Sequence, residues 1–113
     1  MEQFWVYNEA FHNLKKGEID MINALMIDKK DDVIVAIEAI EKGSEISYKL
    51  KDGKVRTLIA LDNITIYHKI AVKDIAKGSP ISKYGEHIGI AATDIKAGMH
   101  VHEHNVESVR EKL

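Results

Sequence analysis

The chain has 113 residues, of which 45% are hydrophobic and 30% are charged, so it can form one domain with its own core and is too short for a second domain of ordinary size. It has no cysteine, which excludes disulfide bonds, thiolate nucleophiles and zinc sites with sulfur ligands. Its 16 basic and 18 acidic residues give a formal net charge of −2, so nucleic acid is not an expected partner.

Residues 1–22 are expected to form an N-terminal extension, and residues 23–113 the main domain. Four apolar side chains of the extension recur three and four residues apart and are followed by a basic turn and a glycine: Phe4, Tyr7, Phe11 and Leu14. This spacing predicts one short amphipathic helix. The helix either packs on its own domain or offers an aromatic face to another subunit, as in a homo-oligomer.

The same N-terminal stretch bears on localisation. It contains four acidic side chains where a secretory signal has a basic start and an apolar stretch: Glu2, Glu9, Glu18 and Asp20. No apolar run in the chain approaches the roughly 20 residues that span a bilayer. We therefore expect a cytoplasmic protein that does not bind membranes.

From Ala24 onward, short runs rich in β-branched residues alternate with polar or glycine-containing turns, which is the pattern of β-strands. The expected strands are residues 24–27, 33–37, 45–50, 55–61, 64–72, 80–82, 88–92 and 99–104. Asp52-Gly53 predicts a hairpin with a type I′ turn. No segment is long enough for a crossover helix, so we expect a mainly β domain of mostly antiparallel strands.

An internal repeat organises these strands. Residues 36–46, 71–81 and 91–101 each begin with alanine, followed by isoleucine, glycine and isoleucine or valine at four, seven and ten residues further on. We interpret each copy as a strand, a single helical turn and a second strand, with glycine supplying the left-handed exit. Asp74 and Asp94 are placed to cap the turns. The copies start 35 and then 20 residues apart, which excludes a solenoid of fixed period.

Four separated motifs follow one another in the second half of the chain: His68-Lys69, residues 71–78, Lys83-Tyr84-Gly85 with Ile88-Gly89, and residues 97–105. In order and separation they resemble the small N-terminal domain of the altronate dehydratase family, which galactarate dehydratases and the small subunit of sulfolactate sulfo-lyase share. The resemblance covers roughly residues 24–106. Tyr67 departs from it, because the family usually has glycine directly before its His-Lys pair.

The resemblance implies a β-clip (SAF-like) fold of short strands and a role in removing water, or sulfite, from a polyhydroxylated acid. It also implies a divalent metal, iron or manganese, and a large catalytic subunit that supplies most of the acidic and metal-binding groups. We therefore expect a small subunit or N-terminal-type domain of a sugar-acid dehydratase that is inactive alone. Two alternatives stay open: a non-catalytic module that binds a sugar acid or oligomerises, and the small subunit of a sulfolactate sulfo-lyase.

Three histidines at alternate positions are the first candidate site. In a strand, His100, His102 and His104 share one face, while Glu103 faces the other way. Imidazoles on one face can bind iron, manganese or zinc, and we take His100 and His102 as the candidate ligands. The alternative is a solvated strand whose histidines bind substrate anions, as His104 would. Asn105 either turns the chain or donates to a substrate hydroxyl.

The remaining candidates lie in two short motifs. His68 titrates near neutral pH, so it can carry a proton or bind a metal, or it is simply hydrogen-bonded to a neighbouring strand. The resemblance implies that Lys69 contacts a carboxylate. Lys83, Tyr84 and Gly85 offer an ammonium group, a hydroxyl group and accessible backbone amides to a sugar-acid carboxylate; alternatively, Tyr84 packs across the core and Lys83 lies in water. We interpret residues 29–32, Lys-Lys-Asp-Asp, as a polar turn.

Overall fold

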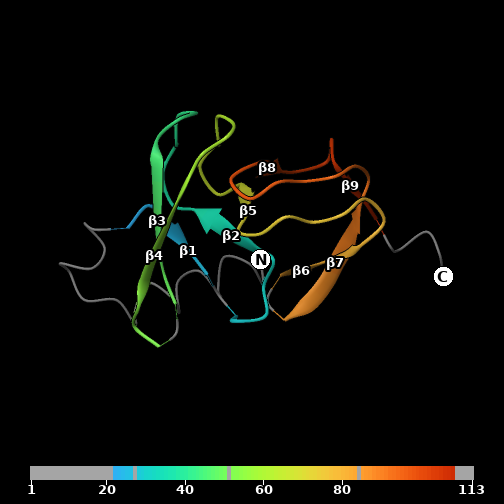
Figure 1. The fold of residues 1–113 in the computed structure, drawn as a ribbon, viewed down its shortest axis with the longest axis horizontal. Helices are drawn as coiled ribbons and strands as arrows, with labels where there is room; N and C mark the ends of the chain where they lie inside the picture. The colour runs from blue at the N-terminus through green and yellow to red at the C-terminus, as the bar shows by residue number, and fades with distance from the viewer. Residues whose placement is uncertain (1–21, 27, 51, 84, 109–113) are drawn as a thin grey trace.

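The computed structural model describes residues 22–26, 28–50, 52–83 and 85–108 of the chain. Six strands form one sheet in the order β4-β3-β1-β2-β5-β8, and three form a second sheet in the order β6-β7-β9 (Figure 1). The strands are β1 (Ala24–Leu25), β2 (Val33–Ala36), β3 (Glu45–Lys49), β4 (Val55–Ile59), β5 (Lys69–Ala71), β6 (Pro80–Lys83), β7 (Glu86–Ala91), β8 (His100–Val101) and β9 (Val106–Glu107). All strand pairs are antiparallel except β1 with β3.

The mainly β prediction is confirmed, with three corrections. The described part of the chain contains no helix, so the predicted single helical turns are tight non-helical turns. For the same reason, this part has no helix that could cross a membrane. The run at 64–72 is a strand only from Lys69, and β9 was not predicted. The hairpin at Gly53 forms, but the amide of Gly53 donates its hydrogen to the carbonyl of Leu50 at 3.0 Å, so Asp52 and Gly53 are the third and fourth residues of the turn rather than the two central residues of a type I′ turn. The predicted N-terminal helix lies outside the described residues.

The repeat occurs four times, one copy more than the sequence analysis found. The additional copy, residues 60–70, has Tyr67 where the others have glycine. The copies form two pairs, and in each pair the residue seven positions after the alanine donates its amide hydrogen to the alanine carbonyl of the other copy. These bonds, 2.7–2.8 Å long, run from Gly43 to Ala60, Tyr67 to Ala36, Gly78 to Ala91 and Gly98 to Ala71. The repeat therefore specifies two pairs of interlocked corners.

Side chains cap these corners across each pair. Asp74 accepts the amide hydrogen of Ala97 at 3.0 Å, and Asp94 accepts that of Lys77 at 2.8 Å. The two aspartates are thus capping residues, as predicted, but each caps the turn of the paired copy. Asn63 plays the same part for Lys42 in the other pair. The equivalent position of the first copy is Ala39, whose side chain has no acceptor.

Each corner pair has its own hydrophobic core. The first core contains Ile40, Ile46 and Ile64, and the second contains Ile75, Ile81 and Ile95. Strands β2 and β5 lie between the two cores and contribute to both, because alternate residues of a strand face opposite sides. Ile34 and Ile70 face the first core, whereas Val33 and Ala71 face the second. The two corner pairs therefore form two halves that meet at β2 and β5, and a site at this junction can combine residues of both halves.

Candidate functional site

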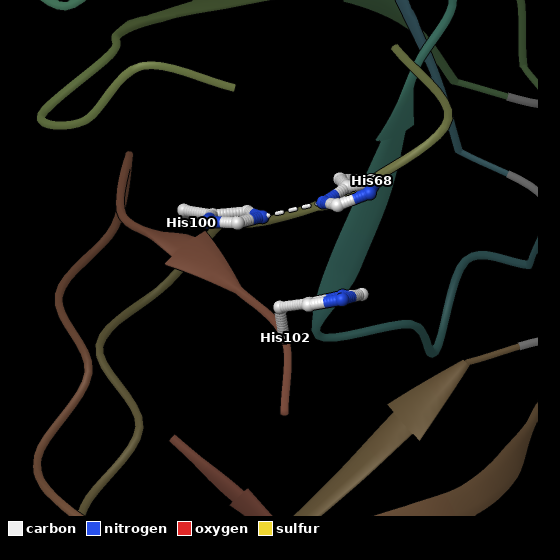
Figure 2. A group of neighbouring side chains, drawn as sticks. All are labelled: His68, His100 and His102. Carbon is white, nitrogen blue, oxygen red and sulfur yellow. Dashed lines mark hydrogen bonds between the residues drawn. The ribbon is translucent and has the colours of Figure 1, made fainter. Parts of the chain in front are cut away.

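Three histidines from two corners come together where β5 pairs with β8. His68 directly precedes β5, His100 begins β8, and His102 follows it (Figure 2). Nδ1 of His68 lies 2.8 Å from Nε2 of His100, so one of the two nitrogens carries the hydrogen that they share. The ring of His102 stacks on that of His68 with centroids 4.2 Å apart. One nitrogen from each ring lies within 4.8 Å of the others. We call these three residues the histidine cluster.

Backbone contacts hold the cluster in place. Asp62 accepts the amide hydrogen of His100 at 2.9 Å. The side chain of Asn105, only 1% exposed, accepts the amide hydrogen of His102 at 2.9 Å and donates to the carbonyl of His100 at 2.8 Å. Asn105 therefore turns the chain after β8, which is one of the two roles left open for it. His104 is exposed, and its ring lies beside that of His100 with centroids 5.3 Å apart.

The cluster favours uncharged imidazoles. Burial, followed by the neighbouring His102 and Lys69, lowers the pKa of His68. Burial also lowers the pKa of His100, and the other histidines add to the effect, while Asp62 opposes it. Protons therefore bind these two rings less readily than they bind a free histidine. At neutral pH, His68 and His100 therefore present unprotonated ring nitrogens, which can accept a proton or bind a metal ion.

A pocket of about 310 Å³ adjoins the cluster. Its walls are Lys69, Lys83, Ile88, His102, Glu103, Val106 and Ser108. The Lys83 side chain is 3% exposed, and burial, followed by repulsion from Lys69, lowers its pKa to about 8, with Asp31 opposing the shift. Burial also lowers the pKa of Lys69, although Glu103 opposes this. With a pKa of about 8, Lys83 remains mostly protonated at pH 7, so the pocket favours an anion.

The geometry corrects the prediction for Glu103. Strand β8 ends at Val101, and residues 102–105 form a turn, so the alternation expected of a longer strand does not continue. Glu103 consequently lines the same pocket as His102 rather than facing away from it. His68 belongs to the cluster, and Lys69 belongs to the pocket. His102 belongs to both and joins them.

The polar turn at residues 29–32 has a role that the sequence analysis missed. Asp31 and Asp32 are buried, and their carboxylates accept the amide hydrogens of Gly85 at 2.9 Å and Ser82 at 2.8 Å. Lys73 forms an ion pair with Asp32 at 2.6 Å. These contacts fix both ends of the segment that carries Lys83. The amide of Gly85 is thereby engaged, and Tyr84 lies outside the described residues. The signal in the sequence is a pair of aspartates directly before an unbroken apolar strand.

Comparison with known proteins supplies the family. The family model for the altronate/galactarate dehydratase SAF domain matches residues 22–109. Altronate dehydratase from Escherichia coli (strain K12) is 40% identical over 84 residues, which are 74% of this chain and 16% of that protein. Altronate dehydratase from Bacillus subtilis is 35% identical over 88 residues, 78% of this chain and 17% of that protein.

A third relative is close to this chain in size. Subunit alpha of (2R)-sulfolactate sulfo-lyase from Chromohalobacter salexigens is 36% identical over 91 residues, which are 79% of this chain and 97% of that subunit. The matched domain is thus a small part of the altronate dehydratases and nearly all of a sulfo-lyase subunit. The family predicted from the four motifs is confirmed. The chain belongs to the altronate/galactarate dehydratase SAF domain family.

Proposed function

We propose that this chain is the substrate-contacting part of a lyase that removes water from a sugar acid and that it works with a larger catalytic polypeptide. One observation carries the proposal: His102 belongs both to the histidine cluster and to the pocket that contains Lys69 and Lys83. A group that accepts a proton or binds a metal ion therefore adjoins a group that binds an anion. Elimination from a hydroxy acid requires both, close together.

In this proposal the two lysines bind the substrate carboxylate. Their ammonium groups line the same pocket, and burial in its walls strengthens their attraction for an anion. Asp31 and Asp32 hold the segment of Lys83 in place, which reduces the entropy lost on binding. His104 and Tyr84 stay substrate-binding candidates for the hydroxyl groups.

The histidine cluster is proposed to bind iron or manganese through His100 and His102, with His68 as a third ligand. The fit rests on three imidazoles whose nitrogens lie within 4.8 Å of one another in a chain without cysteine. The 2.8 Å contact between His68 and His100 holds a proton that a metal ion would displace. When bound, the metal would act as a Lewis acid on a substrate oxygen. His68 is also the candidate proton carrier, through Nδ1, which shares a hydrogen with Nε2 of His100.

The larger partner is proposed from the comparisons of length. The matched domain is 16% of the Escherichia coli altronate dehydratase, so most of that protein lies outside it. It is 97% of the Chromohalobacter salexigens subunit alpha, whose name indicates a further subunit. That coverage also favours a second candidate function, the small subunit of a lyase that acts on a sulfonated hydroxy acid such as sulfolactate.

Reconstitution tests the proposal. The chain is co-purified with candidate large subunits, and elimination from altronate, galactarate and (2R)-sulfolactate is measured with Mn²⁺ or Fe²⁺. We expect activity only in the pair, with the active substrate deciding between the two candidate functions. Lys69→Met and Lys83→Met should raise KM, whereas Lys42→Met, at an exposed corner, should not. Full activity of the chain alone would refute the two-part enzyme, and binding without turnover in every pairing would identify a non-catalytic module.

A further inference from the structure

The exposed apolar side chains of this domain are concentrated in one short stretch. Among the described residues, every exposed large hydrophobic side chain lies between positions 55 and 67: Val55, Ile59, Leu61, Ile66 and Tyr67. Val55 and Ile59 belong to β4, the edge strand of the six-stranded sheet. Edge strands with exposed apolar side chains are sites where other chains dock, and soluble proteins usually protect them. We call these five residues the apolar edge.

The four corners provide an internal comparison. The two residues at the corner tips are Lys42-Gly43, Lys77-Gly78 and Ala97-Gly98 in three copies, but Ile66-Tyr67 in the fourth. Tyr67 has a φ of +68°, in the left-handed region that the three glycines occupy at +86° to +93°. A side chain there costs roughly 1–2 kcal/mol. Tyr67 is 57% exposed, so more than half of its surface is open to a partner.

The apolar edge borders the histidine cluster at two points. Tyr67 directly precedes His68, and Leu61 directly precedes Asp62, whose carboxylate accepts the amide hydrogen of His100. A polypeptide that covers Leu61 and Tyr67 would therefore lie beside the cluster. It could supply the acidic side chains that a set of three histidines lacks.

We infer that the apolar edge is the surface on which the larger catalytic polypeptide docks, with Ile66 and Tyr67 as its main contacts. The inference rests on the proposed function, because it takes its partner from there. A strained, exposed tyrosine at a corner that leads into the histidine cluster is explained by a partner that buries it next to that cluster. A second copy of this chain would have no such reason to lie at this corner rather than at another.

The test replaces Ile66-Tyr67 with the Lys-Gly sequence that stands at the tips of two other corners. The variant Ile66→Lys/Tyr67→Gly removes the apolar contacts together with the positive φ of a non-glycine residue, so it should fold at least as well as the wild type. Binding is measured by biolayer interferometry to the companion subunit of the Chromohalobacter salexigens sulfo-lyase, purified without its subunit alpha. Lys77→Ala, at the tip of another corner, is the matched control.

We expect the double variant to bind the companion subunit at least roughly tenfold more weakly than the wild type, and Lys77→Ala to bind like the wild type. Unchanged affinity of the double variant would overturn the inference and leave the proposed function standing. Failure of the wild type to bind would instead remove the partner on which both depend. If the double variant changes only the oligomeric state, measured by light scattering, the edge is an interface between copies of this chain and the inference is wrong.

Discussion

The backbone of Gly98 lies directly against the backbone of Ile59: a Cβ atom at Gly98 would overlap the carbonyl oxygen of Ile59, and the carbonyl of Gly98 accepts the amide hydrogen of Leu61 at 2.9 Å. This contact joins the last corner to the end of β4. Because β8 begins only two residues after Gly98, the contact also fixes where His100 enters the histidine cluster.

Gly98→Ala is expected to destabilise the domain far more than Gly43→Ala. Both glycines have φ near +90°, so each substitution incurs roughly 1–2 kcal/mol of backbone strain. Nothing lies within 4 Å of a Cβ at Gly43, whereas one at Gly98 meets the Ile59 backbone. Urea denaturation of both variants measures the difference. Equal losses of stability in the two variants would show that the backbones of Ile59 and Gly98 are not in tight contact in solution.

Ala39→Asp is expected to stabilise the domain by about 0.5–1 kcal/mol, by analogy with other capping side chains. The aspartate would accept the amide hydrogen of Ile66, as Asp94 accepts that of Lys77 in the other pair. Asp94→Ala should lower the free energy of unfolding by a similar amount, and Ala39→Leu, which adds no acceptor, should not raise it. Chemical denaturation distinguishes these outcomes, and a destabilised Ala39→Asp would contradict the equivalence of the corners.

Tyr67→Gly alone is expected to raise the free energy of unfolding by up to about 1 kcal/mol. Glycine adopts the φ of +68° without strain, although it gives the unfolded chain more freedom, and this reduces the gain. Differential scanning calorimetry measures the change, with Tyr67→Ala as the control that removes the side chain and keeps the strain. A loss of stability in Tyr67→Gly but not in Tyr67→Ala would show that the strain is negligible.

Lys83→Met tests the buried ammonium group through its pH dependence. The pKa of Lys83 is lowered to about 8 in the folded chain, against an ordinary value of 10.5, so between these values the unfolded chain holds more protons than the folded chain. Stability then rises with pH across this window. Relative to Lys83→Met, the wild type should therefore gain up to about 3 kcal/mol between pH 7 and 11. Parallel pH profiles in urea denaturation would show that Lys83 titrates normally.

His100→Ala and His102→Ala are each expected to weaken Mn²⁺ binding by roughly tenfold or more, because each removes a proposed ligand. His87→Ala, an exposed histidine on β7, is the control. Because the pKa of His68 and of His100 is lowered, protons should compete with the metal only below about pH 6.5. Calorimetric titration of the reconstituted complex from pH 8 to 5 measures both effects. Unchanged affinity in both variants would exclude a metal site at the cluster.

Periodicity in the sequence predicted the corners because alanine, isoleucine and glycine are required there by close packing and backbone conformation. The copy at residues 60–70 was not predicted, because Tyr67 replaces the glycine that the other three copies have. The three histidines were identified individually, but only strand pairing brings His68 beside His100. Asp31 and Asp32 could not be assigned from the sequence, because their partners are backbone amides 50 or more residues away, and any residue except proline can supply such an amide.

The interlocked corners also bear on how the chain folds. The paired alanines are 24 residues apart in the first half and 20 in the second, so each set of corner bonds closes a short loop. Contacts of such local range are associated with rapid folding. Each half can form its corners early, and pairing of β2 with β5 then joins the halves. The histidine cluster lies where β5 pairs with β8, so it would be assembled together with the corners of the second half, before this last step.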